Sequence, residues 1–270
     1  MKKLALYGLA LGFIACQAAC QTEKKDAGQT DSATFTAIDT LTYTYDSVRV
    51  YPKQPVSKNP AVTDTAKAVI SYPVFKDSSL SSFVLKKVLA TADEGRSYSS
   101  YQTYAEGFTK EFEDFSTQQK DYQQTWFLDI STKVLRQEKG YIALQTRFVS
   151  YMGGAHPNSV FSYLNYDPVN KQEILLDSLI LPGSMDKLNS IAEGIFRKNE
   201  KLAPGSNLKE GYFFENDKFS LNRNFTITEK GLQFLYNPYE IKAYVYGTTT
   251  LLIPFSELKG IARPNSLISR

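Results

Sequence analysis

The chain has 270 residues, with 31 Lys or Arg against 28 Asp or Glu, which is long enough to bury one or two hydrophobic cores. Its two cysteines, Cys16 and Cys20, lie near the start, so no disulfide, thiolate nucleophile or cysteine-bound metal can occur in residues 21–270. Without Lys2 and Lys3 the basic residues number 29, and the nearly neutral remainder has no basic stripe that would indicate a nucleic-acid partner.

The first residues have the pattern of an export signal. Two lysines precede the apolar run Leu4 to Ala15, which is too short to cross about 30 Å of hydrocarbon as a helix. The run ends in a segment, Phe13-Ile14-Ala15-Cys16, that resembles a bacterial lipobox. We therefore expect a signal peptide over residues 1–15 and a lipid on Cys16 that holds the protein to a bilayer in the cell envelope, with its body in the periplasm or at the cell surface. Cys20 is the alternative lipid site, and an ordinary cleaved signal is the other alternative.

Residues 16–40 are polar and small with no apolar periodicity, which predicts a flexible tether. Alternation predicts strands over residues 42–51 and 66–75, and Pro73 favours an edge or a bend in the second. A helix should follow, with Ser78 or Ser79 as its N-cap. Its apolar face consists of Leu80, Phe83, Val84 and Val88.

The clearest helical stripe runs from Tyr98 to Phe115, and we interpret it as a core face. An acidic run accompanies it, and we interpret this run as the solvated face of the helix. It consists of Glu106, Glu111, Glu113 and Asp114. Paired carboxylates of the kind that glycosidases use need no histidine, so the sequence does not exclude them.

Strands are predicted over residues 125–134, 141–151 and 159–166, and a helix is predicted after Ser184. A hairpin should join residues 224–228 to 232–236, and a last strand should cover residues 248–253. Strands outnumber helices and are joined by hairpins. The predicted class is therefore α+β, with mainly antiparallel sheets and a few packed helices.

One turn combines Gly153 and Gly154 with His156, Pro157 and Asn158. Glycine permits unusual backbone angles, proline fixes φ, and asparagine bonds locally, so we expect a structural turn tied to a strand by His156. Ligand contact by His156 and Asn158 is the alternative, and catalysis by His156 is a weaker one.

The segment Tyr236-Asn237-Pro238-Tyr239 places two aromatic rings on a loop made rigid by proline. A preorganised aromatic loop loses little entropy on binding, so these four residues are candidate ligand contacts. The alternative is a strand end whose rings cover the core.

Two motifs resemble a bacterial envelope family, domain of unknown function 3298. The first is Tyr151-Met152-Gly153-Gly154-Ala155-His156-Pro157-Asn158, and the second is Phe234 to Ile241 followed by Ile253-Pro254-Phe255-Ser256-Glu257-Leu258. The preceding region more loosely resembles domain of unknown function 4163. The resemblance implies a two-part ectodomain, with parts over residues 41–150 and 151–262 and a tail over 263–270.

Relatives of this family include a lysozyme-sensing ectodomain and the accessory domains of a peptidoglycan deacetylase. A polysaccharide deacetylase uses an Asp-His-His metal site, and His156 is the only histidine, so we expect no metal, no cofactor and no catalytic residue. We therefore expect a non-enzymatic domain that binds or senses a cell-wall glycan or a lysozyme-like protein. The alternatives are a carboxylate-dependent cell-wall hydrolase and a scaffold subunit of an envelope complex.

Overall fold

The computed structural model describes residues 41–56 and 64–269. The predicted signal peptide, the tether and the lipid sites Cys16 and Cys20 lie outside the described residues. Within the described ranges, none of the helices is both long and apolar enough to span a membrane. The fold is α+β, as predicted, with mostly antiparallel strands.

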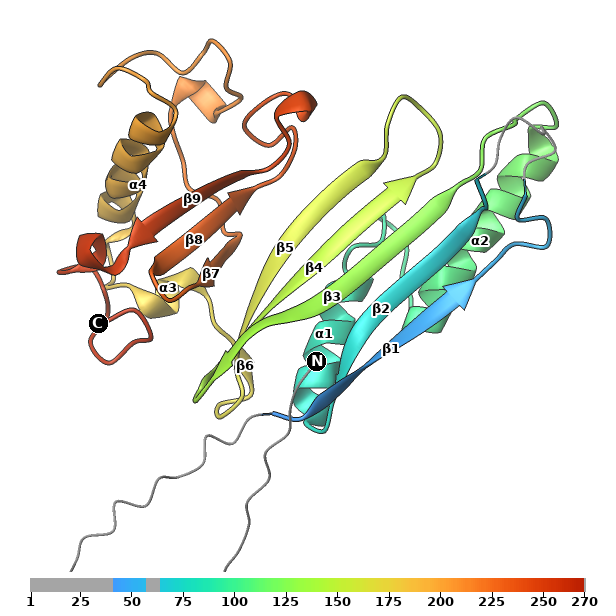
Figure 1. Cartoon of the computed structure of the whole chain (residues 1–270), viewed down its shortest axis with the longest axis horizontal. Coiled ribbons are helices and arrows are strands. Elements are labelled where there is room, and N and C mark those ends of the chain that lie inside the picture. Colours follow the sequence, from blue (N-terminus) through green and yellow to red (C-terminus); the bar gives the residue numbers. More distant parts are fainter. Residues whose placement is uncertain (1–40, 57–63, 270) are drawn as a thin grey trace, which may run out of the picture. The chain divides into compact units, whose positions relative to one another are not determined.

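A six-stranded sheet forms the first half, in the order β1-β2-β3-β4-β5-β6 (Figure 1). Its strands are β1 Tyr43–Val50, β2 Lys67–Phe75, β3 Phe127–Glu138, β4 Tyr141–Tyr151, β5 Asn158–Asp167 and β6 Gln172–Glu173. The turn at residues 139–140 joins β3 to β4, which pair from Phe127↔Tyr151 to Glu138↔Tyr141 with a bulge between Val134 and Arg136. The sequence located every strand of this sheet except the two-residue β6.

One pair in this otherwise antiparallel sheet is parallel. Strand β2 runs parallel to β3 from Lys67↔Phe127 to Ser71↔Ser131, and the connection passes through two helices. Strand β2 is therefore an interior strand and not an edge. Pro73 lies beyond the last pair with β3, so its missing N–H removes no hydrogen bond on that side.

The two helices of the crossover, α1 (Ser78–Leu89) and α2 (Tyr101–Gln118), lie against one face of this sheet (Figure 1). Asp77 caps α1, where its Oδ1 accepts hydrogen bonds from the N–H groups of Ser79 and Leu80, so the expected serine cap is wrong. Ser100 caps α2 through a capping box with Thr103. Tyr98, which the spacing of apolar residues predicts as the start of the helical stripe, therefore lies before the helix.

The second half is a three-stranded antiparallel sheet, β7-β8-β9, with a long helix beside it (Figure 1). Its elements are α3 Leu176–Leu179, α4 Met185–Asn199, β7 Phe225–Ile227, β8 Gly231–Tyr236, β9 Thr249–Pro254 and the 3₁₀ turns η1 Glu215–Asp217, η2 Tyr244–Tyr246 and η3 Phe255–Leu258. Gly231 has φ +156°, and a Cβ there would meet the carbonyl oxygen of Ile253 at 2.0 Å, so the close approach of β8 to β9 requires glycine. The hairpin and the last strand were predicted to within two residues.

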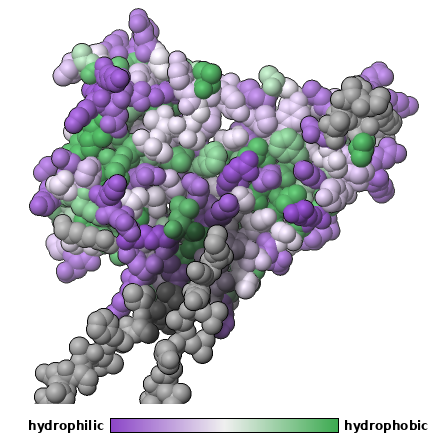
Figure 2. All heavy atoms as spheres, in the orientation of Figure 1, coloured by the Kyte–Doolittle hydropathy of each residue, from purple (hydrophilic) through white to green (hydrophobic). Residues whose placement is uncertain are grey.

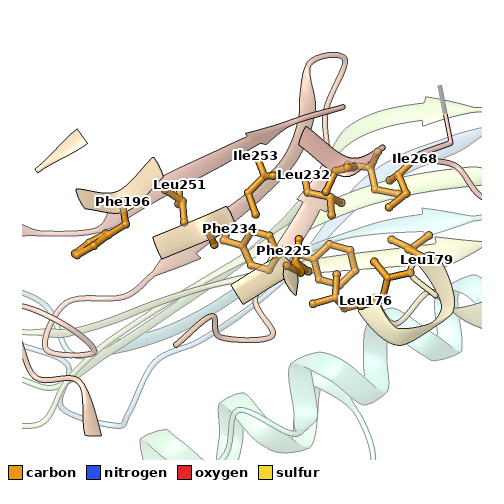
Figure 3. Packing of buried hydrophobic residues seen from close by; sticks show 14 of the residues in the cluster. Leu176, Leu179, Phe196, Phe225, Leu232, Phe234, Leu251, Ile253 and Ile268 are labelled. Atoms are coloured by element: carbon orange, nitrogen blue, oxygen red, sulfur yellow. The ribbon is translucent and has the colours of Figure 1, made fainter. Parts of the chain in front are cut away.

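Two hydrophobic cores meet on the two faces of β4. Ile142 and Leu144 point into the core that α1 and α2 cover, whereas Tyr141 and Ala143 belong to the core of the three-stranded sheet. Figure 3 shows the second core, in which Phe196 of α4 lies near Leu251 of β9. Alternate residues of one strand therefore support both halves.

Side-chain amides connect β5 to the C-terminal half. Asn224 accepts a hydrogen bond from the Tyr163 N–H at 2.7 Å and donates to the carbonyl of Phe161 at 2.8 Å. Asn237 accepts from the Phe161 N–H at 2.7 Å. Two asparagines thus satisfy backbone groups on the edge of β5 that a neighbouring strand would otherwise pair.

Candidate functional site

The Gly153–Asn158 turn has the unusual backbone angles that its two glycines predicted. Gly153 and Gly154 have φ of +99° and +105°, and a Cβ on Gly153 would meet the hydroxyl of Tyr122 at 2.7 Å. The Tyr151 hydroxyl closes the turn by donating to the Gly154 carbonyl at 2.9 Å. Larger residues are excluded at Gly153 both by the backbone angle and by the lack of space.

His156 lies at the surface and connects this turn to the C-terminal half. Its ring stacks on Tyr244, with centroids 3.8 Å apart and planes 14° apart. Its Nδ1 lies 3.0 Å from the Pro157 carbonyl oxygen, and its Nε2 lies 3.3 Å from the Tyr239 hydroxyl. His156, Tyr239 and Tyr244, hereafter the aromatic cluster, therefore bring together two segments that are distant in sequence.

The structure separates the four residues of the predicted aromatic loop. Tyr236 is only 1% exposed and donates its hydroxyl to the Ser220 carbonyl, so the expectation that it contacts a ligand is wrong. Asn237 uses its side chain on β5, and Pro238 is half-buried. Tyr239 is exposed and points to His156. Asn158 is also exposed, on β5 where it pairs with Ser150.

A pair of acids that sequence reasoning missed consists of Asp93, in the α1–α2 connection, and Glu111, on α2. Arg96 contacts both of them through one nitrogen, with its Nη1 3.2 Å from Asp93 Oδ2 and 2.5 Å from Glu111 Oε2. The Glu111 side chain is only 26% exposed, so the expectation of a fully solvated acidic face is wrong at this position. Asp93 lies more in the open, in the loop before α2.

Burial raises the pKa of Glu111 above its ordinary value. The Arg96 guanidinium opposes this effect, and the neighbouring Asp93 carboxylate adds to it. Tyr98 lies nearby, because its ring packs directly on Gly107, where a Cβ would meet the ring at 2.4 Å, and the Glu111 charge adds to the raised pKa of Tyr98. A pair of carboxyl groups in unlike environments can divide the roles of proton donor and proton acceptor.

A small cavity of about 20 Å³ lies beside Asp93 and Arg96 and reaches Met152, which precedes the Gly153–Asn158 turn, hereafter the signature turn. Asp93 and Arg96 line it together with stacked Tyr98 and Tyr104, and Met152 contributes from the other side. The volume is that of about one water molecule. Asp93 and the residue before the turn therefore line the same small cavity.

A second set of acids lies in a wide groove of about 580 Å³ between β5 and the loop before β7. Glu173 receives two hydrogen bonds from Lys87, at 2.6 and 2.8 Å, and Asp177 pairs with Arg223 at 2.8 Å at the side of the groove. Both carboxylates are thus held by an adjacent cation. They form the alternative acidic site.

The surface around these features contains both hydrophobic and hydrophilic residues. Figure 2 shows hydrophobic residues in several patches that hydrophilic residues interrupt. Across residues 41–56 and 64–269, no group of three or more His, Cys, Asp or Glu side chains is placed to hold a metal ion.

Two regions of the chain match models of known protein families. Residues 177–256 match the model described as protein of unknown function DUF3298. This confirms the resemblance for the C-terminal region, where the Asn-Pro-Tyr-Glu motif lies, whereas the Gly-Gly-Ala-His-Pro-Asn motif lies outside this match. Residues 61–159 match the model described as Deacetylase PdaC, so the expected domain of unknown function 4163 is replaced by this family.

A curated relative and two solved structures resemble the chain. The peptidoglycan-N-acetylmuramic acid deacetylase PdaC of Bacillus subtilis strain 168 is 27% identical over 206 residues, which cover 74% of this chain and 39% of that protein. A DUF3298 family protein from Pseudomonas aeruginosa PAO1 has a TM-score of 0.67 at 20% identity, covering 83% of this chain and 95% of the other. A DUF3298 family member from Bacteroides fragilis NCTC 9343 also has a TM-score of 0.67, at 19% identity, with coverages of 84% and 96%.

These matches correct the functional expectation. Both the N-terminal family model and the relative are named for a deacetylase, which overturns a non-enzymatic binding or sensing domain as the main hypothesis. The hydrolase alternative fits them better. The two solved structures support the fold.

Proposed function

We propose that this protein is a hydrolase of cell-wall peptidoglycan that uses the Asp93–Glu111 carboxyl pair. The observation that carries the proposal is a half-buried glutamate with a raised pKa beside an exposed aspartate, within a region similar to a peptidoglycan deacetylase. Such pairs perform acid and base catalysis in enzymes that cleave polysaccharides.

The two acids have complementary roles in this proposal. Asp93 accepts a proton from a water molecule as the water oxygen attacks the substrate. Glu111, whose pKa is raised by burial, gives its proton to the departing group, and solvent then restores the starting protonation states. Arg96 lies between the two carboxyl groups and stabilises negative charge that develops there.

Turnover of purified peptidoglycan tests the proposal. Released acetate and new reducing ends are measured separately, which identifies the bond that is cleaved. We expect Glu111→Gln and Asp93→Asn each to lower kcat at least 100-fold, the typical contribution of general acid–base catalysis. Asp114→Asn is the matched control, because Asp114 lies on the same helix and pairs only with Lys110 at the surface.

Two outcomes would contradict the assignment. A wild-type protein that releases neither product would refute the hydrolase. Loss of activity in Glu173→Gln together with full activity in Glu111→Gln would assign catalysis to the acids of the groove instead.

We also propose that the protein is held to a membrane of the cell envelope by a lipid on Cys16. The support is the apolar run and the lipobox-like Phe13-Ile14-Ala15-Cys16. Labelling with radioactive palmitate should be lost in Cys16→Ser and kept in Cys20→Ser. The reverse pattern would assign the lipid to Cys20, and an unlabelled wild type would refute the anchor.

A further inference from the structure

The backbone of Tyr239 is unusual for an exposed aromatic residue. Its φ is +66°, a left-handed conformation that disfavours side chains other than glycine, asparagine and aspartate, yet its side chain is 57% exposed. A tyrosine here costs the fold strain and buries little apolar surface. Residues that persist in such conformations gather at binding and catalytic sites.

The surrounding loop holds Tyr239 in this conformation. The carboxylate of Glu240 accepts hydrogen bonds from the Asn237 N–H and from the Asn222 side chain, both at 2.7 Å. The Glu240 N–H in turn donates to the Asn237 carbonyl at 3.0 Å. The ring is therefore presented by a preorganised loop, which lowers the entropy lost on binding.

The rings of the aromatic cluster form a platform with polar edges. Tyr239 and Tyr244 have centroids 5.5 Å apart, and His156 stacks on the second of them. Val245 and Tyr246, which follow directly in the chain, are among the most exposed hydrophobic residues described. This surface joins apolar ring faces to hydroxyl and imidazole groups.

The hydrogen bonds of His156 leave one polar atom ready for a ligand. Nδ1 faces a carbonyl oxygen, so in the neutral ring it carries the proton and Nε2 accepts from the Tyr239 hydroxyl. The Tyr239 oxygen then keeps lone pairs that can accept a hydrogen bond from a ligand. The nearest lysine in sequence, Lys242, is held by Glu200 at 2.6 Å, so its charge is already paired.

We infer that the aromatic cluster is a binding subsite for an N-acetylated sugar ring of the glycan strand. The inference rests on the proposed function, which makes peptidoglycan the substrate. A neutral sugar offers apolar C–H faces to the rings and hydroxyl or amide N–H groups to the Tyr239 oxygen, which matches the platform in both respects. The signature turn connects this subsite to the Asp93–Arg96 cavity, because Met152 lines the cavity and His156 joins the cluster.

Nuclear magnetic resonance on the full chain tests the subsite directly. His156 is the only histidine, so its imidazole signals report on the cluster alone. We expect these signals to shift in a saturable way when soluble N-acetylglucosamine tetramers or muropeptides are added. Unchanged signals up to millimolar ligand would overturn the inference.

Calorimetric titration of variants supplies the second measurement. Tyr239→Gly removes the ring and also relieves the left-handed backbone, so we expect a folded protein that binds the tetramer about tenfold more weakly. Tyr51→Ala is the matched control, because Tyr51 is 51% exposed at the end of β1 and should leave binding unchanged. Equal affinity in Tyr239→Gly and wild type would contradict the subsite.

The two proposals fail in different ways. Tyr239→Gly should raise KM without lowering kcat, whereas Glu111→Gln should abolish turnover and still shift the His156 signals. Sugar-dependent shifts in a protein that turns over nothing would refute the hydrolase and uphold the subsite. Turnover with a KM unaffected by Tyr239→Gly would uphold the hydrolase and refute the subsite.

Discussion

At the scale of single residues, Glu111 shows how burial acts on a charged group. Burial raises its folded-state pKa, so the native protein favours its neutral form more than the unfolded chain does. Its contribution to the free energy of unfolding is therefore complete below the unfolded pKa of about 4.3 and is lost as the pH rises through the folded value. The burial of this acid thus lowers stability at neutral pH.

This linkage gives a prediction for Glu111→Gln. Between pH 4 and pH 7 the wild type should lose stability relative to the variant, because glutamine stays neutral throughout. Urea denaturation at several pH values measures the difference. Asp114→Asn, at an exposed position of the same helix, should not show the same trend. If the wild type instead became more stable relative to Glu111→Gln as the pH rises, this result would contradict the raised pKa of Glu111.

At the scale of elements, the Tyr141 hydroxyl links β4, β5 and β7. It donates to Asn165 Oδ1 at 2.7 Å and accepts from the Ile227 N–H at 3.0 Å, in a fully buried position. Asn165 in turn donates to the Phe225 carbonyl at 2.7 Å. A buried polar network of this kind stabilises only while each member keeps its partner.

Tyr141→Phe should therefore destabilise the protein by about 2 kcal/mol, because it leaves the Ile227 N–H and Asn165 short of a buried partner. Chemical denaturation measures the loss. Tyr163→Phe is the control, since its hydroxyl bonds only to the half-buried Gln233 side chain and should cost less. Equal losses in the two variants would show that the network adds nothing to an ordinary hydrogen bond.

Sequence patterns predicted these elements well and their side-chain partners poorly. The Tyr141–Tyr151 strand and the signature turn follow from alternation and from Gly153 and Gly154, which are local signals. The sequence pattern put Glu111 on a solvated face, because Arg96, which pairs with it, and Tyr98, which lies nearby, come from the loop before the helix. The one available signal was Gly107, a glycine in the middle of an apolar stripe that left room for a ring.

At the scale of the whole molecule, the two halves depend on one another through β4. Tyr141 and Ala143 complete the core of the three-stranded sheet, while Ile142 and Leu144 complete the other. A strand that is buried on both faces has a continuous apolar run in its sequence. The run at residues 141–144 therefore could not show that alternate residues belong to two different cores. The predicted ligand contact of Tyr236 is wrong for a similar reason. Packing between distant segments decides whether a ring at a strand end covers the core or faces water.

The two asparagines that bond to the backbone of β5 also bear on how neighbouring copies of the protein behave. Unsatisfied peptide groups along a strand recruit strands from other molecules and start aggregation. Asn224 and Asn237 occupy those groups at Phe161 and Tyr163, so this border of the sheet is capped by side chains. These peptide groups of β5 are therefore not free to pair with a strand from another copy, which disfavours growth of a shared sheet between copies.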